Sequence, residues 1–174
     1  MTTLTATAYH EAGHVALAHI AGIHVFDKDI VITGRTHAFA PIKRDPHQCL
    51  ARQADCGKLS EADYDLETAI IAAAGSEAER VYIVKAGIPV DESAIQLGAQ
   101  GDVKLAEELC GEGVWPDLCA RAAHYLQRPL VWILVERVAS AILGNKGVLK
   151  ADSVTEVLER TSAEFDVPSF EILR

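Results

Sequence analysis

The sequence predicts a mainly α-helical (α+β) fold with a small β-sheet near the N-terminus. Several long stretches repeat apolar residues every three or four positions, as amphipathic helices do, whereas residues 24–42 are rich in β-branched and aromatic residues typical of strands. The chain has 174 residues, of which 49% are hydrophobic, and contains no low-complexity segment. Because this length suffices for one buried core, we expect a single domain over residues 1–174.

The N-terminal part predicts a helix followed by a hairpin. The helix begins with Thr2 or Thr3 as its N-cap and ends at Ala21, just before a glycine. Two strands are expected at about residues 29–33 and 36–42, joined by a turn at Gly34 and Arg35.

The middle of the chain predicts one long helix between two loops. Residues 43–58 contain a proline and show no hydrophobic period, which indicates a long surface loop. Ser60 and Asp63 resemble a capping box, and helical spacing continues from there towards Gly87. Residues 88–97 are again expected to form a loop.

The C-terminal half predicts four more helices. Pro129 is typical of a first helical position, and Asp152 or Ser153 is the expected cap of the last helix. The expected ranges are about 101–110, 117–127, 129–143 and 152–164.

Composition and charge exclude several kinds of partner and site. A formal net charge of −9 opposes binding to nucleic acid and to anionic membranes, so we expect neither partner. The first residues lack the basic and apolar segments of a secretory signal, and no apolar run reaches the length of a membrane span, which predicts a cytoplasmic location. No two of the four cysteines form a C-x-x-C pair, so we expect reduced thiols.

The stretch "AYHEAGHVALAHIAG" carries the strongest chemical signal. Residues four apart on a helix are offset by about 40° around the axis and about 6 Å along it. His10 and His14 therefore project side by side and could bind the same ion. Glu11 lies close enough to reach a water on that ion. His19 falls on the opposite side of the helix and is expected to be a solvated or core histidine. The alternative for His10 and His14 is a pair of buried imidazoles satisfied by hydrogen bonds.

This stretch, followed later by "GAQGDVKLAEEL", resembles the peptidase domain of FtsH, the AAA+ zinc protease family. That family pairs A-x-HEAGH-A with a later G-A-x-x-D motif whose aspartate completes the metal site. The resemblance therefore implies a zincin-like helical metallopeptidase domain in which His10, His14 and Asp102 bind Zn²⁺. The segment "AGSEAERV" is also similar to the family's L-G-G-R-A-A-E-E stretch and matches it at Gly75, Ala78 and Glu79.

Three acidic residues keep alternative interpretations. Asp102 could instead be a plain first-turn or N-cap residue of its helix. Glu79 competes with it as the third ligand, although we favour a role for Glu79 in orienting one of the histidines. Glu77 stands where the family has alanine, on the apolar face of its helix, so it is expected to be buried, paired or wrongly placed.

The predicted function is a zinc-dependent metalloendopeptidase that hydrolyses peptides or unfolded proteins, with Glu11 activating a water bound to the zinc. Tyr82, His124 and Tyr125 are candidates for stabilising the oxyanion. The strand in "DIVITGR", residues 29–35, could pair with an extended substrate.

The sequence leaves the energy source and some alternatives open. It carries no G-x-x-x-x-G-K-[ST] loop for ATP, so a separate ATPase or adaptor is a possible partner, and the oligomeric state is open. The alternative functions are a catalytically idle zinc-binding interaction module and a helical protein without a metal.

Overall fold

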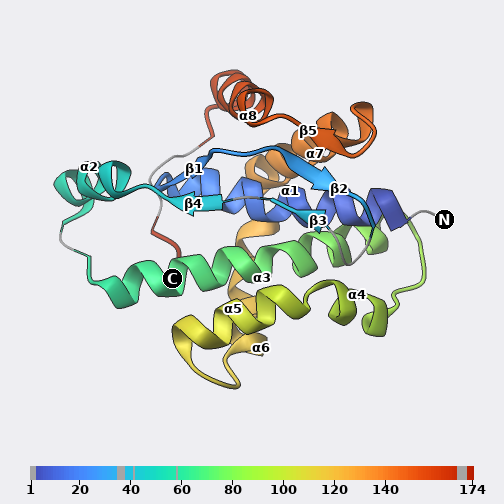
Figure 1. The fold of residues 1–174 in the computed structure, drawn as a ribbon, viewed down its shortest axis with the longest axis horizontal. Helices are drawn as coiled ribbons and strands as arrows, with labels where there is room; N and C mark the ends of the chain where they lie inside the picture. Colours follow the sequence, from blue (N-terminus) through green and yellow to red (C-terminus); the bar gives the residue numbers. More distant parts are fainter. Residues whose placement is uncertain (1–2, 35–37, 41, 58, 168–171) are drawn as a thin grey trace.

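The computed structural model describes residues 3–34, 38–40, 42–57, 59–167 and 172–174. Within these residues it contains eight helices and five short strands (Figure 1), which confirms the predicted mainly α-helical (α+β) class. No helix in this described part is long and apolar enough to span a membrane.

Two long helices run side by side through the middle of the molecule: α1 (Thr3–Ala21) and α3 (Glu61–Lys85) (Figure 1). Small residues allow them to approach closely. A Cβ atom added at Gly13 of α1 would overlap the backbone carbonyl oxygen of Ala74 and would lie 2.6 Å from the Cβ atom of Ala78, both on α3. The alanine-rich centre of α3 is therefore a contact surface for α1, and every residue of α3 from position 69 to position 79 is buried.

The end of α1 and the start of α3 agree closely with the sequence, whereas Thr3 is the first residue of α1 and Thr2, the other predicted N-cap, lies outside the described residues. Helix α1 ends at Ala21 as predicted. Ser60 and Asp63 form the predicted capping box at the start of α3: the Ser60 side chain accepts from the Asp63 backbone N–H, and the Asp63 carboxylate accepts from the Ser60 backbone N–H at 2.8 Å.

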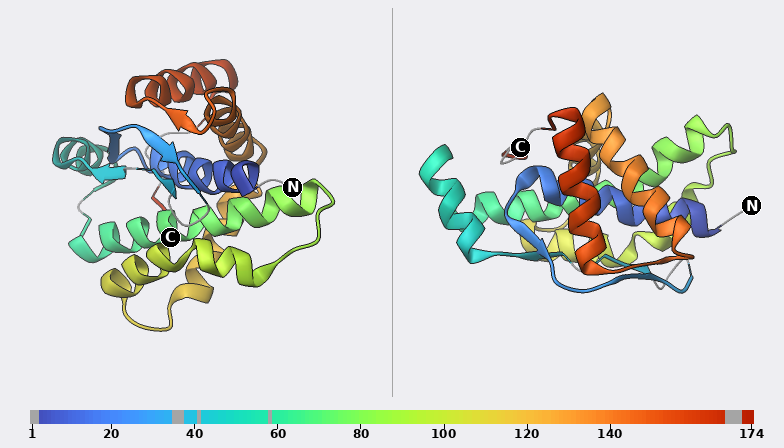
Figure 2. Two further views of the ribbon diagram at one scale, coloured as in Figure 1. Left: turned by 45° about the vertical axis from the view of Figure 1, so that its right-hand side comes forward. Right: turned by 90° about the horizontal axis from the view of Figure 1, so that it is seen from above.

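The four C-terminal helices lie within two residues of their predicted ranges. They are α5 (Gln100–Cys110), α6 (Trp115–Leu126), α7 (Pro129–Gly144) and α8 (Ala151–Phe165). Helices α5 and α6 pack against α3, and α7 packs against α1. Helix α8 crosses above α1 (Figure 2). The prediction of its cap is wrong, because Lys150 occupies the N-cap position and Asp152 and Ser153 lie inside the helix.

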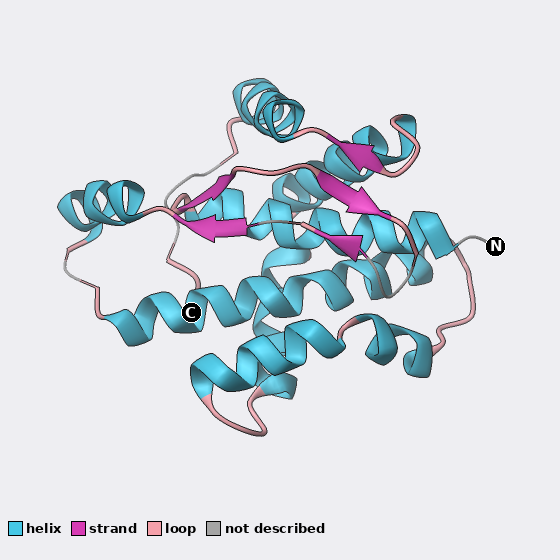
Figure 3. Cartoon of the chain, viewed as in Figure 1, coloured by secondary structure: helices cyan, strands magenta, loops and turns pink. Residues whose placement is uncertain are grey.

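The strands gather over one side of the helices (Figure 3) and form two small antiparallel sheets. The predicted hairpin is confirmed by β2 (Ile30–Ile32) and β3 (Ala38–Phe39), with Val31 opposite Phe39. The strand β5 (Val148–Leu149) pairs with the other edge of β2. The predicted turn at Gly34 and Arg35 lies partly outside the described residues.

A second sheet, which the sequence did not predict, joins β1 (His24–Phe26) to β4 (Ile42–Arg44). The prediction of a long loop at residues 43–58 is also wrong, because α2 (Pro46–Cys56) begins there, shortly after β4. Asp45 caps α2 by accepting from the His47 backbone N–H at 2.9 Å, and the proline that suggested a loop is the first residue of the helix.

The loop expected at 88–97 is also partly wrong. Helix α4 (Glu92–Gly98) occupies its second half, and Asp91 caps this helix by accepting from the Ala94 backbone N–H at 3.0 Å. A seven-residue helix is too short to show a clear hydrophobic period, so only the cap residue signals its start.

Candidate metal centre

The structure brings His10, His14 and Asp102 together. The two histidines lie one turn apart on α1, and Asp102 comes from the first turn of α5. His10 Nε2 lies 3.1 Å from Asp102 Oδ2, and His14 Nε2 lies 3.6 Å from Asp102 Oδ1. One ligand atom from each of the three residues lies within 4.8 Å of the others.

Two of these distances are close to those expected between the ligand atoms of a tetrahedral metal site. Ligand atoms about 2.0–2.1 Å from a zinc ion, at the corners of a tetrahedron, are about 3.3 Å apart. The two nitrogen–oxygen distances, 3.1 and 3.6 Å, lie on either side of that value. Two imidazoles and one carboxylate also form a donor set that zinc accepts, and three protein ligands leave the fourth position open.

Both imidazole rings are oriented by a group on α3. His14 Nδ1 donates to the backbone carbonyl of Ile71 at 2.8 Å, which leaves Nε2 as the atom that can bind a metal. His10 Nδ1 lies 3.4 Å from Glu79 Oε2, so its Nε2 likewise faces Asp102. Glu79 therefore lies behind His10 and not beside the other ligand atoms, the place expected for a residue that orients a ligand.

Gly75 provides the space for the histidine rings. A Cβ atom at this position of α3 would overlap His14 Nε2 and would lie 2.6 Å from His10 Nε2. No other residue type fits here without displacing the two nitrogen atoms that would bind the ion. The match to the FtsH motif at Gly75 thus coincides with a steric requirement of the site.

Glu11 is buried beside this group, with only 3% of its surface exposed. Burial raises the pKa of its carboxyl above the ordinary value, and the Asp102 charge adds to this, while His14, His10 and a hydrogen bond from the Ala40 backbone N–H oppose it. A carboxylate whose pKa is raised towards neutrality is a better proton acceptor and donor in hydrolysis than an ordinary one. Ala40 directly follows β3, so this contact ties the strand to the site.

Protons and a metal ion would compete for the same atoms. Burial disfavours charge on His10, but hydrogen bonds with Asp102 and Glu79 outweigh it and raise its pKa to about 10. Burial opposes the charge on Asp102 as well, yet His14 and His10 hold the pKa of its carboxyl well below the ordinary value. A divalent cation bound here would replace the proton on His10, so the affinity of the site for that cation is expected to rise with pH.

The other histidine and acidic candidates lie away from the centre. His19 is partly buried, and its Nε2 is hydrogen-bonded to Ser162 Oγ at 2.8 Å, in agreement with the predicted non-ligand role. Glu77 is both buried and paired, because its carboxylate binds the guanidinium of Arg80, which also binds Glu92. This pair resolves the open prediction for Glu77.

Of the three residues predicted to stabilise an oxyanion, Tyr125 has its hydroxyl hydrogen-bonded to other parts of the chain. Its hydroxyl donates to the Ile172 carbonyl at 3.4 Å and accepts from the Arg174 backbone N–H at 2.9 Å, so it fixes the C-terminal residues. His124 stacks edge-on against Tyr125. Tyr82 stacks on Tyr9, with ring centroids 4.1 Å apart.

The predicted substrate strand requires a correction. Strand β2, which forms the centre of "DIVITGR", is paired on both edges, with β3 and with β5. It has no free edge to offer a substrate. Among the described residues, the outer strands of this sheet are β3 and β5, neither of which was predicted as a substrate-binding strand.

Two further contributors were missed because they are backbone groups. The Ile71 carbonyl and the Ala40 N–H carry no side-chain signature, and only the folded chain places them against His14 and Glu11.

Comparisons of this chain with protein-family models, with curated proteins and with solved structures give no match. The likeness to FtsH peptidases therefore rests on the two motifs and on Gly75, Ala78 and Glu79.

Proposed function

We propose that this protein is a zinc metalloendopeptidase that hydrolyses peptides or unfolded proteins. One observation carries the proposal: two histidines of α1 and an aspartate of α5 converge within 4.8 Å, with the buried carboxylate of Glu11 next to them. A merely structural site would use the same three ligands but would have no use for a fourth, buried acidic side chain that is not itself a ligand.

In this proposal His10, His14 and Asp102 hold the ion. When bound, zinc supplies Lewis-acid chemistry that polarises a peptide carbonyl and lowers the pKa of water. Glu11 takes the proton from the attacking water as its oxygen bonds to the carbonyl carbon. The same carboxyl then gives that proton to the amide nitrogen as the carbon–nitrogen bond breaks.

The residues around Glu11 support these two proton transfers. The Ala40 N–H hydrogen-bonds the carboxylate and so restricts its rotation, while burial raises its pKa. The site thus keeps a proton acceptor in one place through both steps. Restricting such a group before the reaction is one way in which enzymes lower a barrier.

The outer edge of β3, which pairs with no other described strand, is the proposed binding place of the substrate backbone. This strand precedes Ala40, whose backbone N–H contacts Glu11, so a chain added to that edge would run past the site. Only an extended segment can add to a sheet edge, which favours peptides and unfolded proteins as substrates. A separate ATPase or adaptor that unfolds proteins remains the proposed partner for folded substrates, and the cytoplasm remains the proposed location.

The experiment compares hydrolysis of a fluorescently labelled, unfolded casein by wild type and by Glu11→Gln at equal zinc content. The variant should retain its zinc and lose at least about 100-fold in rate, the size expected for a general base. Glu156→Gln, an exposed glutamate of α8, is the matched control and should cleave like wild type. Zinc-loaded wild type without cleavage would instead support the catalytically idle zinc-binding module.

A further inference from the structure

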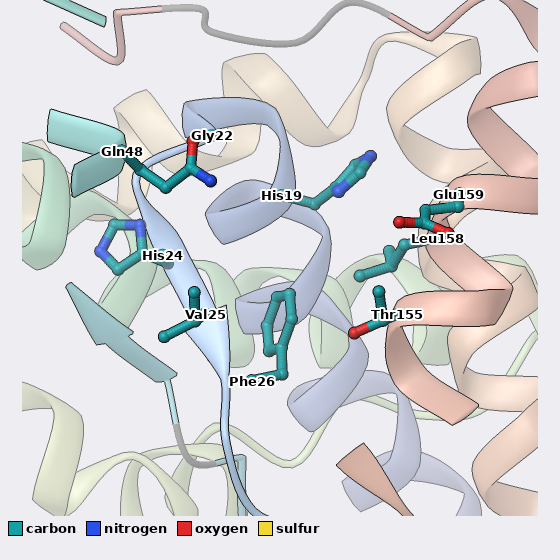
Figure 4. Close-up of a pocket in the computed structure, with 9 residues that line it drawn as sticks. All are labelled: His19, Gly22, His24, Val25, Phe26, Gln48, Thr155, Leu158 and Glu159. Atoms are coloured by element: carbon teal, nitrogen blue, oxygen red, sulfur yellow. The ribbon is translucent and has the colours of Figure 1, made fainter. Parts of the chain in front are cut away.

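A separate cavity lies on the other side of α1 from the metal centre. It has a volume of about 520 Å³, and residues from the end of α1, from β1, from α2 and from α8 line it (Figure 4). His19, which lines it, is nine positions after His10 and so points about 180° away around the helix. A cavity of this size is typical of sites for small organic ligands.

The charge of the lining selects the sign of a ligand. Glu159 of α8 lines the cavity, and its side chain is exposed. Burial lowers the pKa of His19, although the Glu159 charge opposes this, and burial together with the charges of Arg44 and Arg52 lowers the pKa of His24 to about 4, so the His24 imidazole is neutral near pH 7. Among the described residues, no lysine or arginine lines the cavity. Arg44 and Arg52 lie near His24 but do not line the cavity, and both are paired with carboxylates of α3, so the Glu159 carboxylate favours a cation over an anion.

The apolar residues of the lining favour a ligand that has an apolar part next to its charged group. Val25 and Phe26 are half-buried and present hydrocarbon surface between the polar residues, whereas Leu158 of the lining is itself buried. Figure 4 shows Phe26 near the centre of the cavity, with Glu159 on the α8 side of it. The face of an aromatic ring also attracts cations, which adds to the effect of the carboxylate.

We propose that this cavity binds a small organic ammonium ion with an apolar body, such as an arylalkylamine. Its ammonium group would meet the Glu159 carboxylate, and its body would cover Val25 and Phe26. The cavity shares no lining residue with the metal centre, so this site does not depend on the proposed peptidase activity.

The probe is 2-phenylethylamine, titrated by calorimetry and by NMR into metal-free and zinc-loaded protein at pH 7. The neutral isostere 2-phenylethanol and the anion phenylacetate are the ligand controls. We expect saturable binding of the amine with a Kd of about 1 mM, the range for a ligand of this size, and equal affinity in both forms of the protein. Glu159→Gln should weaken binding about fivefold, and Glu156→Gln, which is exposed on the same helix but does not line the cavity, should leave it unchanged.

Several results would overturn the proposal. Absence of saturable binding up to about 20 mM amine is one, because it lies well beyond the expected Kd. Equal affinity for phenylacetate, or an unchanged Kd in Glu159→Gln, would show that charge does not select the ligand. Binding that requires zinc would show that the amine coordinates the metal centre, and it would leave the peptidase proposal intact.

Discussion

Replacing Gly75 with alanine should separate metal binding from folding. The added Cβ atom would lie 2.6 Å from His10 Nε2, whereas ordinary contacts begin at 3.4 Å, so the ring must move by about 0.8 Å. It would overlap His14 Nε2 as well, and that ring is tied to the Ile71 carbonyl by a 2.8 Å hydrogen bond. Zinc–ligand distances tolerate only about 0.2 Å of error. Gly75→Ala should therefore bind zinc at least about 100-fold more weakly than wild type. Mutating a residue that orients a metal ligand typically lowers metal affinity about 10- to 100-fold, so this loss is at or beyond the upper end of that range.

The fold should survive the same change. Alanine is favoured over glycine inside a helix by about 1 kcal/mol, which offsets part of the steric cost. The assay is competition for zinc with a chromophoric chelator, accompanied by circular dichroism of the metal-free protein. Gly101→Ala is the matched control, because a Cβ atom there, next to the proposed ligand Asp102, meets nothing within 4 Å. Zinc affinity in Gly75→Ala equal to that of wild type would refute the placement of the ion.

Three further predictions concern the ligands and stability. Glu79→Gln should weaken zinc binding about 10- to 100-fold and Asp102→Asn more than that, as measured with the same chelator; the reverse order would make Glu79 the third ligand. His24 has a pKa of about 4 in the folded protein, whereas its ordinary value is 6.5. Between these two pH values the unfolded chain binds more protons than the folded protein does. The free energy of unfolding therefore rises with pH, by up to about 3 kcal/mol between pH 4 and pH 6.5. Urea unfolding of His24→Gln should show a shallower rise from pH 4.5 to 6.5, and an unchanged slope would contradict this origin. Arg52→Met should lower stability by about 3–5 kcal/mol, because it leaves the fully buried Glu67 carboxylate uncompensated, and substituting Glu67→Met as well should restore most of the loss; a single variant as stable as wild type would count against it.

Helices with long apolar faces could be predicted from the sequence because their signal is repeated many times. The first helix, the capped helix after Ser60 and the four C-terminal helices all carry such repeats, and their ends lie close to the expected ones. The second sheet could not be found in this way. Strands β1 and β4 have three residues each, and their pairing depends on contacts between distant parts of the chain.

Pro46 shows how one residue can indicate opposite structures. Proline breaks a helix from within but favours its first turn, and the deciding feature is a good cap before it. Asp45 is that cap, and weighing the pair together would have predicted α2.

The candidate site was predictable where side chains carry the chemistry. Helical spacing alone places His10, Glu11 and His14 together, but the position of Asp102 came from the resemblance to a known motif. Spacing cannot show that α5 folds back against α3 and faces the histidines, since that depends on tertiary packing. The orienting backbone groups and the outer edge of β3 became visible only in the structure.

The most direct measurement of the central claim is the zinc content of the protein purified without chelators. We expect about one zinc ion per chain in wild type and in Glu11→Gln, since Glu11 is not a proposed ligand, and almost none when His10 and His14 are both replaced by alanine. Less than about half an equivalent of zinc or another divalent ion in wild type, or an unchanged content in the double variant, would contradict it.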